Sequence, residues 1–324
     1  MTTVLVTGVG AIIGYGILRS LRQAAQPLRL IGADIFPDAV GRAWSDDFIQ
    51  APLTADAGYL NWLERTIVVN RVDLVMPGIE QDLYCFAENR VFFSELGVRV
   101  VLNAERLTQL TADKWLMHEE LKRIRSAARI PSFLAGEYSD LAETLGTPFL
   151  LKPRKSYASK GLVRVGSPAE FAACSPELGT RLMAQPVIGS DEEEYTVAAF
   201  GDGSGRVNAS IALRRRLAAD GSTAKAWVAS PAGLDEVVAS LCAHFKPVGP
   251  TNLQFRCDSS GWKLLEINPR ISSTTSIRTA FGYNESEMCV DYFVGGKEIR
   301  QPLLKQGFAA RYIEDRVVYD RDNF

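Results

Sequence analysis

The chain is poor in the residues that most often build metal centres and nucleophilic sites. It holds only two histidines, His118 and His244, and its five cysteines are scattered with no C-x-x-C pair. The sequence therefore offers few residues for a histidine-based zinc site or a Ser–His–Asp triad. Because His118 lies in a predicted helix with no visible nucleophile or ligand partner, we predict a surface histidine. An odd number of scattered cysteines predicts reduced thiols and a cytoplasmic location.

A strong charge imbalance and long apolar runs are also missing. The formal net charge of −2 over 324 residues gives no bulk electrostatic reason to bind nucleic acid or an anionic membrane. No apolar run reaches the roughly 18 residues that a membrane span needs. The start MTTVLVTGVG lacks the basic region and the cleavage site of a signal peptide. We therefore expect neither a nucleic-acid nor a membrane partner, and a soluble chain of two or three domains.

The first hundred residues alternate between strand and helix patterns. Apolar strands are predicted at residues 4–7, 28–34, 72–76 and 98–102. A glycine-rich turn over residues 8–16 enters a helix that runs to about residue 25, and further helices are predicted at residues 59–70 and 83–96. This βαβ rhythm predicts a parallel sheet covered by helices on both faces. Near residue 110 the alternation gives way to longer strands in hairpins, so an α+β part with antiparallel sheets is predicted to follow the α/β part.

The glycine-rich stretch TGVGAIIGYG follows the first strand, and Asp34 closes the second, as in dinucleotide-binding folds. The glycine spacing is imperfect, because Ala11 and Ile13 stand where such motifs carry glycine. The catalytic tyrosine and lysine of a short-chain dehydrogenase are also missing, since Tyr157 and Lys160 are one residue too close. An NAD(P)-dependent oxidoreductase stays an alternative, and the other interpretation is that the glycines only permit tight strand-to-helix packing.

The most informative segment is TNLQFRCDSSGWKLLEINPR, residues 251–270. It predicts two strands joined by a short turn, so Glu266 and Asn268 point to one side and Gln254 on the first strand can face them. Three side-chain oxygens suit a hard cation such as Mg²⁺, which usually shares its coordination with phosphates. Arg270 follows on the same side, where it can meet charge that develops in phosphoryl transfer. A carboxylate between Leu265 and Ile267 in an apolar strand is costly unless it is paired or bound to metal.

With these residues the chain resembles the ATP-grasp enzymes, and among them the carbamoyl-phosphate-synthetase-like carboxylate–amine ligases. Asp113-Lys114, Lys152-Pro153 and the stretch LMAQPVIGSDEEEYTV carry the resemblance together with EINPR. It implies a Rossmann-like pre-ATP-grasp domain over residues 1–110, a small lobe with a phosphate lid over residues 111–185, and a large lobe with the Mg-ATP site over residues 186–324.

The resemblance also implies roles for single residues. Those expected to bind the nucleotide are Lys114, Lys152, Ser156, Lys160, Gly161, Gln185, Val187, Ile188, Glu194 and Asn268. Those expected to hold Mg²⁺ are Gln254, Glu266 and Asn268, and those expected to contact the transferred phosphoryl group or a carboxylate are Arg270, Arg214 and Arg216. Within this set, residues 154–161 occupy the place of the mobile phosphate lid, and Glu194 that of the ribose contact.

The reaction implied is the activation of a carboxylate by ATP as an acyl phosphate, followed by attack of an amine. The expected partners are therefore a small carboxylate and an amine, with ATP and Mg²⁺ as cofactors. A homodimer, which is common in this family, stays open, as does a non-catalytic ATP-binding protein. Glu80 follows the third strand at the carboxyl edge of the sheet, and it suits either a substrate amine or the positive end of a helix.

Overall fold

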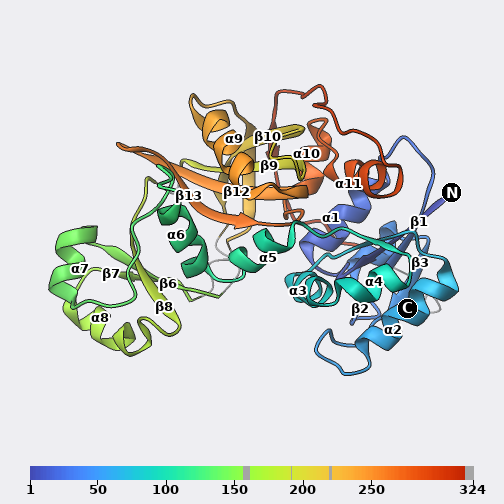
Figure 1. Cartoon of the computed structure of the whole chain (residues 1–324). Helices are drawn as coiled ribbons and strands as arrows, with labels where there is room; N and C mark the ends of the chain where they lie inside the picture. Colours follow the sequence, from blue (N-terminus) through green and yellow to red (C-terminus); the bar gives the residue numbers. More distant parts are fainter. Residues whose placement is uncertain (156–160, 191, 219–220, 318–324) are drawn as a thin grey trace.

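The computed structural model describes residues 1–155, 161–190, 192–218 and 221–317. Within these residues the strands form three sheets. Figure 1 shows the parallel sheet with α2, α3 and α4 at one end, the small sheet with α7 and α8 at the other, and the large sheet spanning between and above them. No helix in the described ranges combines the length and apolar character that a membrane crossing needs.

The N-terminal part is a five-stranded parallel sheet in the order β3-β2-β1-β4-β5, which confirms the predicted α/β architecture. Its strands β1 and β2 are buried along most of their length, as expected for strands covered on both faces. Its strands are β1 (Thr2–Thr7), β2 (Leu28–Asp34), β3 (Asp47–Gln50), β4 (Leu74–Met76) and β5 (Arg99–Val100). Its helices are α1 (Ile12–Leu21), η1 (Val40–Trp44), α2 (Tyr59–Asn70), α3 (Glu80–Glu88) and α4 (Arg90–Glu95). The helix predicted over residues 83–96 is therefore two helices that meet at Asn89.

Glycines after β1 and after β4 permit close packing of the backbone. A Cβ at Gly14 would lie 2.2 Å from the carbonyl oxygen of Gly8, and a Cβ at Gly78 would lie 2.2 Å from that of Thr7. The Asp34 carboxylate accepts from the backbone N–H of Gly10 at 2.7 Å and from that of Phe36 at 3.1 Å. The acid in the ribose-binding position of a dinucleotide fold is thus tied to its own loop. This geometry gives the oxidoreductase alternative no support.

The large sheet has the strand order β13-β12-β9-β10-β11-β14, with antiparallel pairing throughout. Its strands are β9 (Glu194–Asp202), β10 (Ala209–Leu217), β11 (Thr223–Val228), β12 (Val248–Asp258), β13 (Gly261–Asn268) and β14 (Phe308–Ala310). One core joins it to α5 (Glu105–Thr111), α6 (Lys114–Arg123) and α9 (Leu234–Phe245). A second core joins it to α1, to the residues of α10 (Thr275–Ala280) and α11 (Glu285–Cys289), and to the π-helical turn η3 (Val290–Val294). The N-terminal part and the large sheet therefore share a continuous core.

The small sheet has the order β7-β6-β8 and its own core. It consists of β6 (Phe149–Pro153), β7 (Val163–Val165) and β8 (Leu182–Pro186), with α7 (Tyr138–Leu145), α8 (Pro168–Cys174) and η2 (Ser175–Glu177) beside it. Phe149, Leu151 and Phe171 fill this core. The division at residues 110 and 185 stays a prediction, and α6 packs against the large sheet rather than in the core of the small one.

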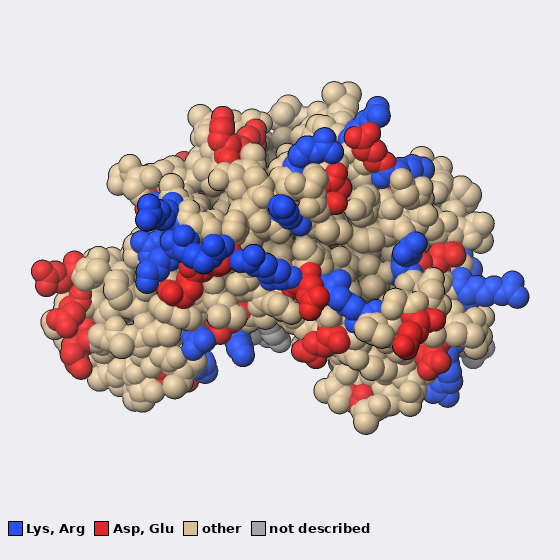
Figure 2. All heavy atoms as spheres, viewed as in Figure 1, with Lys and Arg blue, Asp and Glu red and all other residues tan. Residues whose placement is uncertain are grey.

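Basic side chains form a band across the face of the molecule seen in Figure 2, and acidic side chains lie at the end that carries α7 and α8 as well as over the N-terminal part. Arg106 and Arg123 each lie 2.7 Å from the nearly buried carboxylate of Glu120. His244 reaches the same carboxylate at 2.6 Å. These arginines hold the pKa of Glu120 down at about 2, with the hydrogen bond from Arg123 as the largest cause.

Candidate active site

A cavity of about 620 Å³ opens where the three sheets meet. Lys152 of β6 and Gln185 of β8 line it from the small sheet, Glu266 of β13 lines it from the large sheet, and Glu80 at the start of α3 lines it from the N-terminal part. The volume is in the range of cavities that enclose small-molecule ligands. All three parts of the fold thus contribute to one site.

The two predicted lysines reach this cavity from different elements. Asp113 caps α6 by accepting from the backbone N–H of Trp115 at 2.9 Å, and its carboxylate lies 2.7 Å from Arg154. The backbone N–H of Lys114 donates to the carbonyl of Arg154 at 2.9 Å. These contacts tie the start of α6 to the end of β6, so that Lys114 and Lys152 line the same cavity.

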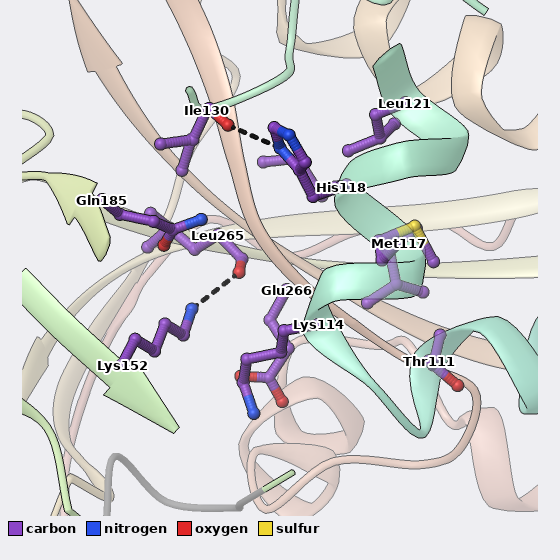
Figure 3. Close-up of a pocket in the computed structure, with 12 residues that line it drawn as sticks. Thr111, Lys114, Met117, His118, Leu121, Ile130, Lys152, Gln185, Leu265 and Glu266 are labelled. Atoms are coloured by element: carbon purple, nitrogen blue, oxygen red, sulfur yellow. Dashed lines mark hydrogen bonds between the residues drawn. The ribbon is translucent and has the colours of Figure 1, made fainter. Parts of the chain in front are cut away.

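The side chain of Lys152 connects the small sheet to the large sheet. Its Nζ donates to the carbonyl oxygen of Leu265 on β13 at 3.1 Å, which bridges the small and large sheets (Figure 3). The pKa of Lys152 is lowered to about 8, mainly by burial; the charge of Lys114 acts in the same direction, while Glu266 opposes them. A bound anion would raise this pKa again, because opposite charges stabilise each other.

A recess of about 30 Å³ lies behind the lysines, and Figure 3 shows the side chains that surround it. Met117, Leu121 and Ile130 give it an apolar wall. His118 also lines it, with Nδ1 3.0 Å from the carbonyl oxygen of Ile130. The side chain is only 5% exposed, so the prediction of a surface histidine was wrong. The helix face that carries His118 turns inward because α6 packs on β13, and burial lowers the pKa of this histidine.

Gln185 is oriented by a hydrogen-bond relay. The hydroxyl of Ser132 donates to the carbonyl of Ile130 at 3.0 Å, so its oxygen accepts from Nε2 of Gln185 at 2.8 Å. The relay fixes which end of the amide points to Ser132 and leaves the carbonyl Oε1 of Gln185 on the other side. Gln185, Val187 and Ile188 all line the cavity.

The three predicted metal-binding side chains lie together on the hairpin of β12 and β13. The strands pair Gln254 with Glu266 and Asn252 with Asn268, and all four residues line the cavity. No group of three acids, histidines or cysteines suited to a metal occurs among the described residues. One carboxylate and two amide oxygens fit Mg²⁺ better than zinc, since Mg²⁺ prefers oxygen and keeps several positions for phosphates and water.

Arg270 continues this row towards the N-terminal part. It forms an ion pair with Glu80, and its Nη2 donates to Oδ1 of Asn268 at 3.2 Å. Arg270 and Glu80 both line the cavity. Glu80 is the first residue of α3, so its carboxylate sits at the positive end of a helix. Its contact with a substrate amine stays a prediction.

The structure corrects the predicted basic pair on β10. Arg215 lines the cavity, while Arg214 lies over the ring of Trp227 at 5.7 Å and Arg216 pairs with Glu192. Side chains alternate along a strand, so Arg215 and its two neighbours point to opposite faces.

Glu194 is a buried residue of β9, the strand between β10 and β12. Its carboxylate accepts from Arg215 at 2.5 Å and from Arg256 at 2.8 Å, and the three residues pair in register across β10, β9 and β12. Glu194 thus holds two arginines at the cavity, and its contact with a ribose stays a prediction. Sequence reasoning missed Arg256, although its spacing of two from Gln254 places both on one side of a regular strand.

The predicted lid is only partly described. Ser156 and Lys160 lie outside the described residues. Gly161 has a φ of +77°, and a Cβ there would lie 3.1 Å from Cγ of Pro153. The lid function of residues 154–161 stays a prediction.

Comparisons with known proteins agree with this arrangement. Residues 180–316 match the family model described as "ATP-grasp in the biosynthetic pathway with Ter operon". An N5-carboxyaminoimidazole synthetase from Staphylococcus aureus is similar with a TM-score of 0.71 at 17% identity, over 94% of this chain and 80% of that chain. The biotin carboxylase domain of a Hydrogenobacter thermophilus 2-oxoglutarate carboxylase, in complex with MgADP and bicarbonate, is similar with a TM-score of 0.70 at 15% identity, over 95% and 73%. An L-amino acid ligase from Bacillus licheniformis reaches a TM-score of 0.66 at 15% identity, over 94% and 75%. A search of curated protein sequences found no match.

Proposed function

The chain has the ATP-grasp fold, and from this premise we propose that it is an ADP-forming ligase that activates a carboxylate with ATP and joins it to an amine. The observation that carries the proposal is the shared cavity, in which Lys114 and Lys152 face the oxygen-rich row of Glu266 and Asn268. Cations opposite metal ligands are what phosphoryl transfer requires.

Each wall of the cavity has a distinct task in this proposal. Gln185, Val187 and Ile188 bind the base, and Lys114 and Lys152 bind phosphate oxygens. Gln254, Glu266 and Asn268 hold Mg²⁺, which neutralises phosphate charge when bound. Arg270 meets the transferred phosphoryl group, and Glu80 keeps Arg270 in place through their ion pair. The chain thus works mainly by positioning and charge stabilisation, with no covalent nucleophile.

A screen of carboxylates paired with amines, read out as ADP release, tests the proposal. Bicarbonate and amino acids are sensible first acids, since the similar proteins include a carboxylase domain with bound bicarbonate and an L-amino acid ligase. We expect ADP release that depends on one acid and one amine. ATP binding without turnover over the whole panel would instead support a non-catalytic nucleotide-binding protein.

ATP binding should take up a proton above about pH 8. Burial lowers the pKa of Lys152 to about 8, so a growing fraction of this side chain is neutral as the pH rises past that value. Bound phosphates favour the ammonium form and raise its pKa again. Affinity for ATP therefore falls as the pH rises through about 8. Calorimetry in two buffers of different ionisation enthalpy measures the uptake; equal heats for the wild type, or unchanged uptake in Lys152→Met, would contradict the assignment.

Loss of the Ser132 hydroxyl should relax the choice of base. In the wild type the relay presents the Gln185 carbonyl, which accepts from the 6-amino group of adenine and disfavours the 6-oxo group of ITP. In Ser132→Ala the amide is free to turn, so the ratio of kcat/KM for ATP over ITP should fall about fivefold to tenfold. Ser139→Ala on the exposed side of α7 is the matched control. An unchanged ratio in Ser132→Ala would contradict the role of Ser132 in orienting the Gln185 amide.

The homodimer and the cytoplasmic location belong to this proposal as well. One similar protein is described as a dimer of its biotin carboxylase domain. All five cysteines are free thiols, which suits a reducing compartment. Light scattering during gel filtration measures the assembly state directly.

A further inference from the structure

Asn252 lines the cavity, although no sequence pattern singled it out. It lies two residues before Gln254 on β12 and pairs directly with Asn268 on β13. Two-residue spacing places Asn252 and Gln254 on one face of the strand. Asn252 therefore belongs to the row that holds Gln254, Glu266 and Asn268, at the end nearer to Arg270.

A buried clamp fixes the orientation of its amide. Nη2 of Arg278 lies 2.5 Å from Oδ1 of Asn252, and the hydroxyl of Thr196 donates to the same oxygen at 2.6 Å. A guanidinium can only donate, so the clamped atom must be the carbonyl oxygen. The amide NH2 is then the group left for the cavity, and it donates to none of the described residues.

Arg278, which holds the Asn252 amide, is itself fixed by a buried ion pair. Arg278 is 0% exposed, and its Nη1 donates to the buried carboxylate of Glu285 at 3.0 Å. Removing one member of such a pair leaves a buried charge without its partner, which is strongly unfavourable. Turning the Asn252 amide around would likewise set two donors against each other. The Asn252 amide is consequently fixed in one orientation, with its NH2 group as a donor towards the cavity.

A donor that faces a cavity and has no partner among the described residues marks a place for an acceptor. The neighbouring residues indicate which kind of acceptor suits this place, because Asn252 pairs with Asn268, a proposed Mg²⁺ ligand, and the positively charged Arg270 donates to Asn268. A group bound between them must be an oxygen with negative charge. In the proposed reaction such oxygens belong to the transferred phosphoryl group and to the carboxylate that receives it.

We infer that Asn252 donates a hydrogen bond to an anionic oxygen at the acceptor end of the cavity, and that Arg278 and Thr196 are positioning residues that keep its amide in the donating orientation. The inference rests on the proposed function. In the step concerned, the bond from the γ-phosphorus to the bridging oxygen breaks and its electron pair leaves with ADP, while a carboxylate oxygen forms the new bond to phosphorus. Asn252 forms no covalent bond and gives up no proton; it stabilises the non-bridging charge.

Asn252→Asp tests the donor, because it keeps the shape of the side chain and its oxygen towards Arg278. The probes are MgADP alone and inorganic phosphate added to the MgADP complex, both followed by calorimetry. We expect Asn252→Ala to weaken phosphate binding about tenfold, and Asn252→Asp to weaken it further by repulsion, with MgADP affinity within about threefold of the wild type. Asn70→Asp is the matched control, since the Asn70 amide oxygen also faces an arginine, Arg29, and does not line the cavity.

Thr196 provides a second variant that does not break the buried ion pair. Thr196→Ser keeps the hydroxyl and should bind phosphate like the wild type, whereas Thr196→Val removes one of the two donors and should weaken phosphate binding about threefold without changing MgADP affinity. Unchanged phosphate affinity in Asn252→Asp, or an equal loss of MgADP affinity, would overturn the role of Asn252 alone. Failure of the wild type to bind MgADP would overturn the proposed function and this inference with it.

Discussion

Lys152→Met is expected to reduce ADP formation by about 10²–10³-fold, the usual cost of removing one preorganised donor from a developing charge. The side chain bridges the two lobes through the carbonyl of Leu265 and lines the cavity next to Lys114. Methionine has a similar length but neither charge nor donor. The measurement is steady-state ADP release with the substrate pair found in the screen, together with the affinity for MgADP.

Stability separates this effect from unfolding. Burial lowers the pKa of Lys152 to about 8, so the fold disfavours its charge, and Lys152→Met should unfold at the same temperature as the wild type or higher. Lys263→Met is the matched control, because the Lys263 ammonium donates to the carbonyl of Ala127 and does not line the cavity. Full activity in Lys152→Met would contradict the phosphate site.

Glu266→Gln is expected to lower turnover by a similar factor of about 10²–10³, because it removes the one carboxylate from the proposed metal-binding row of Gln254, Glu266 and Asn268. The replacement keeps the size of the side chain and an oxygen donor, so that only the charge is lost. The Mg²⁺ concentration for half-maximal activity should rise at the same time. A titration with Mg²⁺ at fixed ATP measures both effects.

Gln254→Glu is the converse variant. It places a second carboxylate opposite Glu266, so the half-maximal Mg²⁺ concentration should fall below that of the wild type. Glu236→Gln, on the exposed side of α9, controls for the general loss of a negative charge. If Glu266→Gln kept the Mg²⁺ dependence of the wild type, the metal would have to be held elsewhere.

The grouping of Gln254, Glu266 and Asn268, the proposed metal-binding row, could be predicted from sequence because strand geometry is local. A spacing of two places Glu266 and Asn268 on one side, whatever the rest of the fold does. The two-residue turn between Asp258 and Gly261 sets the register, which brings Gln254 opposite Glu266 once the irregularity next to Phe255 is included. The parallel sheet was likewise foreseeable, since its strands are apolar and its helices follow at regular intervals.

The arginines of β10 show the limit of the same rule. Alternation states that Arg215 points away from Arg214 and Arg216, but it does not say which side faces a cavity. That choice follows from the packing of β10 between β9 and β11 and from Glu194 on the neighbouring strand, which draws Arg215 inward. His118 is a similar case, because its burial depends on which face of α6 meets β13.

The sequence by itself determined the order of the parts and the residues that share a strand face, because both depend on contacts within a few positions of the chain. The tertiary structure alone decided which faces meet across the cavity. Asn252 lies 26 residues from Arg278, and Lys152 lies 113 residues from Leu265. Hydrogen bonds over such separations form only when the packed sheets and helices bring their ends together, and no local pattern encodes them.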